Sequence, residues 1–260
     1  MLKPRIIPCL LVHNGGLVKT VNFRNPKYVG DPINAVRIFN EKEADELMVL
    51  DIDATVNGAE PNFKMIDHLA NESQMPLCYG GGVKSVDQIR KIVGLGVEKV
   101  AISSAALESP AIVEQASMEV GSQSVVVVID VMRRKGFFSK GWNINTHNGK
   151  KTHNQELSEF VKQMEDAGAG EIVLNSIDKD GAMSGYDVEC ASMIKMNIDI
   201  PLTVLGGAGD LSHMVELFSV CGLVGAAAGS LFVFKGKYRA VLINYPAVES
   251  KDELAKIAYV

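Results

Sequence analysis

The stretch SVVVVID, residues 124–130, decides the fold. Its unbroken aliphatic run has no polar alternation, which is typical of a strand covered on both faces in a parallel sheet. Short apolar runs of this kind, bounded by turn residues, recur along the chain at 6–11, 47–52, 76–79, 98–103, 124–130, 171–176, 201–205 and 222–228. We therefore expect eight buried parallel strands.

Segments with the composition of helices separate these runs. They lie at residues 32–45, 62–71, 86–93, 110–120, 158–167, 188–196 and 212–219. Strand and helix in regular alternation predict an α/β fold, a closed (β/α)₈ TIM barrel, with an open doubly wound sheet as the alternative. Such barrels take about 250 residues as one unit. The 260 residues therefore predict a single domain over 1–260.

The chain also resembles itself. A shift of 125 residues places Gly81 and Gly82 on Gly206 and Gly207, and a shift of 119 places the first strand on residues 125–131. Two related half-barrels, at about residues 1–120 and 121–245, are expected from this repeat.

Charge and cysteine content exclude several classes of protein. The chain has 26 basic and 31 acidic residues, a net charge of −5, which argues against a nucleic-acid partner or a membrane surface. No stretch reaches the ~20 apolar residues of a membrane span. Residues 6–12 are too short for a signal peptide, so a cytoplasmic location is expected. Four scattered cysteines, Cys9, Cys78, Cys190 and Cys221, form no metal-binding pattern, and we expect no metal and no cofactor.

Each half carries a glycine turn after its third strand and a small-residue turn after its fourth. Glycine lets the backbone approach an anion, and backbone N–H groups can then bind it. Simple tight turns are the alternative, but a symmetric pair at one barrel mouth favours a substrate with a phosphate at each end. The first phosphate cup is expected at Gly81, Gly82, Ser103 and Ser104, and the second phosphate cup at Gly207, Gly229 and Ser230.

Two connections are longer than the others. Residues 12–31 contain Lys19 and Arg24 among glycines, which is typical of a mobile active-site loop. Residues 131–152, with Gly136 among several glycines, indicate an inserted hairpin. Both connections follow strands, so both are expected at the C-terminal face of the barrel.

Six segments together resemble one family closely. They are KPRIIPCL (3–10), DELMVLDIDA (45–54), GGGVKS (80–85), SQSVVVVID (122–130), GAGEIVLNSIDKDGAMSGYD (168–187) and GGAG (206–209). The resemblance, from about residue 3 to 235, is to the cyclase subunit of imidazole glycerol phosphate synthase in histidine biosynthesis. It implies a barrel that binds a glutaminase subunit on its N-terminal face and receives ammonia along its axis. In that family the ammonia enters a bis-phosphorylated nucleotide, which is cleaved and cyclised.

Four charged residues stand at or just before strand starts: Arg5, Glu46, Lys99 and Glu171. Two cations and two anions can form a closed ring of ion pairs at the barrel floor, and buried charges need such pairing. Surface charges at strand ends are the alternative. The resemblance implies that these four residues form an ammonia gate.

The chain departs from the family at one catalytic position. Members that run the cyclisation use two aspartates, ending the first and fifth strands, as complementary acid and base. Asp130 matches the aspartate that ends the fifth strand; the alternative is that it only caps the next loop. Leu11 occupies the place of the aspartate that ends the first strand. Losing one partner of such a pair costs roughly 10²- to 10⁴-fold in rate. His13 lies two residues beyond Leu11 and is the nearest group that could replace it.

The resemblance also implies further binding residues. Lys19 matches a lysine of the first loop that closes over substrate, and Asp51, Asp180 and Gly181 match acidic or phosphate-adjacent positions. A retained pair of phosphate cups with half an acid/base pair favours a paralogue.

Three readings of function follow. The first is a synthase subunit of a glutamine amidotransferase pair, in the acetamidino-modification branch, which helps deliver ammonia to a third protein that makes an acetamidino sugar for surface polysaccharide. The alternatives are a true histidine-pathway cyclase and a non-catalytic ammonia channel or docking module. The sister isomerase of the histidine pathway shares the phosphate cups but needs no ammonia, so the four charges argue against it. A phosphorylated small-molecule substrate is expected in the first two readings.

Overall fold

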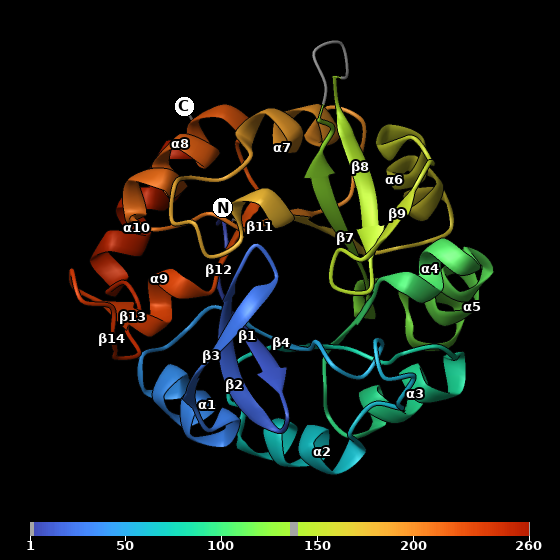
Figure 1. Cartoon of the computed structure of the whole chain (residues 1–260), viewed down its shortest axis with the longest axis horizontal. Helices are drawn as coiled ribbons and strands as arrows, with labels where there is room; N and C mark the ends of the chain where they lie inside the picture. The colour runs from blue at the N-terminus through green and yellow to red at the C-terminus, as the bar shows by residue number, and fades with distance from the viewer. Residues whose placement is uncertain (1–2, 136–139, 260) are drawn as a thin grey trace.

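Eight parallel strands close into a barrel in the computed structural model, which describes residues 3–135 and 140–259 (Figure 1). The barrel strands are β1 (Ile6–His13), β4 (Leu47–Asp51), β5 (Leu77–Gly80), β6 (Lys99–Ile102), β7 (Val125–Arg133), β10 (Glu171–Ser176), β11 (Leu202–Leu205) and β12 (Gly225–Ala228). Each pairs in parallel with its neighbour in chain order, and β1 pairs with β12 to close the circle. The predicted TIM barrel is confirmed, and the open sheet is wrong because no barrel strand keeps a free edge. The division into half-barrels stays a prediction.

Helices surround the barrel on the outside (Figure 1). They are α1 (Pro32–Glu41), α2 (Phe63–Glu72), α3 (Val86–Gly94), α4 (Ser104–Glu108), α5 (Ala111–Val120), α6 (Leu157–Asp166), α7 (Val188–Lys195), α8 (Leu211–Cys221), α9 (Ser230–Val233) and α10 (Val248–Ile257), with 3₁₀ turns η1 (Ser122–Ser124) and η2 (Ile177–Lys179). Several begin at side-chain caps: Asp31 accepts from Asn34 N before Pro32, and Ser85 accepts from Gln88 N. None of these helices, within residues 3–135 and 140–259, combines the length and apolarity of a membrane span.

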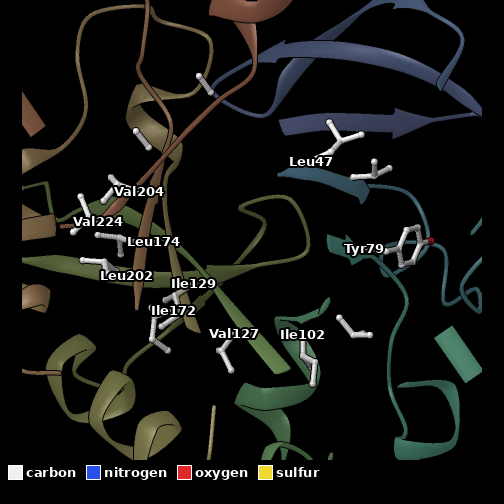
Figure 2. Close-up of a cluster of buried hydrophobic side chains, with 14 of the residues drawn as sticks. Leu47, Tyr79, Ile102, Val127, Ile129, Ile172, Leu174, Leu202, Val204 and Val224 are labelled. Atoms are coloured by element: carbon white, nitrogen blue, oxygen red, sulfur yellow. The ribbon is translucent and has the colours of Figure 1, made fainter. Parts of the chain in front are cut away.

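The strands bury side chains on both faces, which explains their unalternating sequence. Outward side chains such as Leu47, Tyr79 and Ile172 pack toward the helices (Figure 2). Inward side chains fill the barrel axis as a separate apolar cluster of Ile7, Cys9, Met48, Cys78, Ala101, Val126, Val128, Val173, Leu205 and Ala227. All four cysteines are buried and free.

Two hairpins interrupt the regular pattern and reach over the C-terminal face (Figure 1). The first, β2 (Gly16–Val21) and β3 (Arg24–Gly30), pairs antiparallel with β1, so residues 12–31 form an ordered hairpin where we expected a loop. The second, β8 (Trp142–Thr146) and β9 (Lys151–His153), continues from β7 and confirms the expected insertion. Gly136, named in that prediction, lies outside the described residues. A short hairpin, β13 (Phe234–Lys235) and β14 (Ala240–Val241), precedes α10, and the sequence did not predict these three elements.

Candidate functional site

A cavity of about 920 Å³ opens at the C-terminal ends of the strands and contains the first phosphate cup. Its wall brings together the predicted Asp51, Gly81, Gly82, Ser103, Ser104 and Asp130. Asp51 is bound to its own loop, because one carboxylate oxygen accepts from Asp53 N (2.9 Å) and Ala54 N (3.1 Å). Burial raises the pKa of Asp51. The wall therefore combines glycine backbone, hydroxyls and carboxylates in one space.

The glycines of the first cup are required by its geometry. Gly81 has φ 121°, and a Cβ there would lie 2.4 Å from Asp51 O. Gly82 has φ 72°, and a Cβ there would lie 2.8 Å from Ala59 O. Both backbones are left-handed and both lack room, so a side chain would have to displace main chain. The turn thus presents bare backbone to the cavity, as an anion-binding loop requires.

The second phosphate cup is nearly filled by Lys19. It is a cavity of about 40 Å³ lined by Gly207, Gly229, Ser230, Asp180, Gly181 and Lys19 among others. Lys19 is 5% exposed, and its Nζ donates to Cys9 O at 2.5 Å. A Cβ on Gly229 would lie 2.5 Å from the same Nζ, so this glycine makes room for the ammonium. Burial lowers the pKa of Lys19. A cation enclosed by glycine backbone is suited to an anionic group, because burying a charge is costly unless it is paired.

Asp180 holds the β2–β3 hairpin over this second cup. Its Oδ2 accepts from Thr20 Oγ1 at 2.7 Å and from Phe23 N at 3.0 Å, and its carbonyl accepts from Asn22 N at 2.9 Å. Burial raises the pKa of Asp180 against these bonds. Asp180 therefore borders the second cup and also holds the hairpin through these hydrogen bonds, and its phosphate-adjacent role stays a prediction.

Asp130 meets the requirements of an acid/base group. It ends the inward-facing row of β7, lines the large cavity, and its Oδ1 accepts from Asn175 Nδ2 at 2.8 Å. Burial raises the pKa of Asp130 to about 7, although the Asn175 hydrogen bond opposes this shift. A carboxyl with a pKa near the working pH can both give and take a proton.

The position opposite to Asp130 carries no proton donor. Leu11 lines the same cavity, beside Leu50. His13 does not line either described cavity: its Nδ1 lies 2.7 Å from Asp53 Oδ1, and the other Asp53 oxygen accepts from Asn14 N at 2.7 Å. The structure therefore does not bring His13 to the place of the missing aspartate.

The four predicted gate residues form a closed ring at the opposite end of the barrel. Arg5 contacts Glu46 at 2.5 Å and Glu171 at 2.7 Å. Lys99 contacts the same two carboxylates at 2.8 and 2.9 Å. Thr203 Oγ1 adds a 2.6 Å hydrogen bond to Glu171. The two glutamates are 2% and 4% exposed, so the ring is a buried structure and not a set of surface charges.

Charge compensation within the ring is effective. Burial disfavours the ionised form of Glu171, but the hydrogen bond and charge of Arg5, with the charge of Lys99, outweigh it and lower its pKa. Burial disfavours the cationic forms of Arg5 and Lys99 too, and the two glutamates again outweigh it, raising both pKa values. Each of these three shifts favours the charged form of its group.

Sequence reasoning missed several residues of the site. Asn175 and Thr203 are polar side chains inside apolar strands, and only their inward position on β10 and β11 could have identified them. His147 and Asn148, in the turn between β8 and β9, line the large cavity, and Asn148 Nδ2 donates to Ile52 O at 3.0 Å. The part of the chain that the structure describes holds no group of three His, Cys, Asp or Glu side chains placed to bind a metal ion.

Comparison with known proteins agrees with this architecture. The model of a family described as histidine biosynthesis protein matches residues 5–239. A putative imidazole glycerol phosphate synthase subunit HisF from Leptospira borgpetersenii is 53% identical over 98% of this chain and 99% of its own length. A putative subunit hisF3 of the same synthase from Vibrio vulnificus is 54% identical, covering 99% and 98%. The imidazole glycerol phosphate synthase subunit HisF of Streptococcus mutans is 41% identical, covering 89% and 91%. The chain belongs to the histidine biosynthesis protein family, alongside these synthase subunits.

Proposed function

We propose that the protein is a synthase subunit of a glutamine amidotransferase pair, in which a glutaminase binds the N-terminal face and passes ammonia through the barrel. The observation that carries this proposal is the closed ring of Arg5, Glu46, Lys99 and Glu171 at one end of the axis, with the large cavity at the other. A ring of buried ion pairs gives little stability for its cost, so its retention favours a functional role.

The barrel axis is apolar between the ring and the cavity. It is packed with side chains that include Cys9, Met48, Cys78, Val126 and Val173, and ammonia would pass between them. An apolar path favours neutral ammonia over ammonium, because an unpaired buried charge costs several kcal/mol. Ammonia that passes the ring would therefore reach the cavity unprotonated and nucleophilic.

We propose further that the subunit is a paralogue of the histidine-pathway cyclase. Leu11 leaves the end of the first strand without the carboxylate that would pair with Asp130, while both phosphate cups keep their glycines. The ammonia would then serve to convert an acetamido sugar into an acetamidino sugar for surface polysaccharide, in the cytoplasm, with a phosphorylated small molecule in the large cavity. A third, amidotransferase protein is the expected recipient or co-catalyst.

A non-catalytic channel and a catalytic barrel differ in what they require of Asp130. A non-catalytic channel, which Leu11 also favours, predicts that Asp130→Asn leaves product formation intact while Glu46 and Lys99 substitutions destroy it. A barrel that performs chemistry predicts loss with Asp130→Asn as well.

One experiment separates the paralogue from a true cyclase. The purified chain is given ammonium at alkaline pH, which replaces the glutaminase, together with the bis-phosphorylated nucleotide of the histidine pathway. We expect turnover at least about 10²-fold below that of a Leu11→Asp variant, because the variant restores the acid/base pair. Equal turnover by both chains would overturn the paralogue assignment.

A further inference from the structure

Three polar side chains at the β8–β9 turn form a continuous chain that the site above does not use. His147 Nδ1 lies 3.0 Å from Thr146 Oγ1, and the same hydroxyl lies 2.9 Å from His153 Nε2. Thr146 is 1% exposed, whereas the two imidazoles are partly exposed. His147 lines the large cavity that also holds Asp130. The hydroxyl thus connects an imidazole that lines the cavity to one that does not.

The chemistry of a hydroxyl dictates how this chain is protonated. Thr146 has one proton to donate and two lone pairs to accept with, so it can bridge the rings by donating to one ring nitrogen and accepting from the other. In this arrangement Nδ1 of His147 and Nε2 of His153 have opposite protonation states when both rings are neutral. Such an arrangement can pass a proton from one imidazole to the other without moving either ring.

The groups that act on His153 come from β9, from the β8–β9 turn and from α4. Burial, Lys151 on β9 and His147 itself lower the pKa of His153, and Glu108 at the end of α4 opposes them. Asp130 and Asp51 share the cavity with His147, and Glu108 lines it too. His153 is thus biased toward the neutral form, which suits a group that transmits a proton and does not hold it.

We propose that His147, Thr146 and His153 form a proton relay that exchanges protons between solvent and the group bound in the large cavity, as a second acid/base system beside Asp130. This inference rests on the proposed function only in assuming that ammonia reacts in the cavity. The relay contributes an acid/base group at the barrel mouth, where Leu11 offers none.

Protons are conserved over one forward and one reverse transfer along the relay. In the first, His153 Nδ1 takes a proton from water, its Nε2 proton moves to Thr146, the hydroxyl proton moves to His147 Nδ1, and His147 Nε2 releases a proton into the cavity. Both rings end neutral, and each has changed from the Nε2–H to the Nδ1–H tautomer. In the reverse passage, His147 Nε2 takes a proton from the cavity and the first state returns. When ammonia displaces a group, one proton is needed by the leaving group and one is lost from nitrogen, so the two passages match the reaction.

The test is nitrogen-15 NMR of the histidine rings in the full chain, which needs neither glutaminase nor acceptor. The sequence contains five histidines, so single His→Gln variants assign each ring. We expect opposite protonation of His147 Nδ1 and His153 Nε2, and a joint tautomer change when inorganic phosphate is added as a probe of the cavity. Thr146→Val should keep any phosphate effect on His147 and abolish the tautomer change of His153, whereas Thr146→Ser should preserve it.

Matched controls keep the result interpretable. The exposed His68 on α2 should be unaffected by the Thr146 substitutions, and far-UV circular dichroism checks that the variants are folded. The relay is overturned if Thr146→Val leaves the tautomer of each ring unchanged from the wild type, or if phosphate alters His147 alone in the wild type. Because this readout is independent of ammonia transfer, its failure would leave the proposed function untouched, and the failure of ammonia transfer would leave the relay intact.

Discussion

At the level of single residues, the cavity places Asp130 where its charge is unfavourable. Folding raises its pKa from an ordinary carboxyl value to about 7, mainly through burial. A carboxyl whose pKa is raised by folding destabilises the folded state most above that pKa, because the unfolded chain ionises freely there. Asp130 therefore costs stability progressively from about pH 4 to pH 7, and this cost persists above pH 7.

Asp130→Asn should remove that cost while keeping the hydrogen bond from Asn175. We expect the variant to gain about 2 kcal/mol relative to wild type between pH 4 and pH 8, because water in the cavity screens part of the cost of the Asp130 charge. Urea unfolding at both pH values measures the gain. A difference between the two chains that does not depend on pH would show that Asp130 is ionised at an ordinary pKa.

The position of Asp130 could be predicted from the sequence, whereas the contacts of Asp180 with the first hairpin could not, for one physical reason. Asp130 follows an apolar strand directly, so its inward position follows from the period of the strand. Asp180 lies beyond η2, in irregular backbone, where no period fixes the direction of a side chain. Its contacts with Thr20 and Phe23 join segments about 160 positions apart, and such pairing is not encoded in a local pattern.

Among the elements, η2 anchors both hairpins of the C-terminal face. Asp178 accepts from Arg133 N at 2.7 Å, at the end of β7 where the second hairpin begins. Asp180, next to η2, accepts from Thr20 and Phe23 of the first hairpin. One short segment thus positions two structures that lie over the cavities.

The two aspartates make matched controls for each other. Asp180→Ala should accelerate amide hydrogen exchange in β2 and β3 about tenfold or more, because it removes the acceptor of Thr20 and Phe23 and each such bond contributes about 1 kcal/mol or more. Asp178→Ala should accelerate exchange at Arg133 and leave β2 and β3 unchanged. Exchange measured by NMR or mass spectrometry distinguishes the two. If either variant accelerated exchange equally in both hairpins, the substitution would have unfolded η2 as a whole, and the two contacts would not act separately.

For the whole molecule, the barrel was predictable because eight apolar runs without alternation permit few architectures. The hairpins over its mouth were less predictable: β2 and β3 are half polar, and their order depends on Asp180. The helix α10 is likewise secured by long-range contacts, since Lys251 reaches Asp45 at 2.8 Å. Such contacts join residues far apart in the chain, so the extensions could not be predicted from local sequence patterns. The core could, because its strands are local apolar runs.

The two ends of the barrel allow a test of the whole path. Arg5→Ala leaves Glu46 and Glu171 buried with Lys99 as their only remaining partner in the ring, which should cost roughly 3–5 kcal/mol of stability. It should also uncouple ammonia transfer: less product per glutamine hydrolysed with the glutaminase partner, but unchanged product with free ammonium. The matched control is Lys3→Ala, which removes an exposed ion pair with Asp252 near the start of the same strand and should change neither quantity. Fully efficient transfer in Arg5→Ala would exclude the ring as a gate, because that variant lacks one of the four side chains that close the ring.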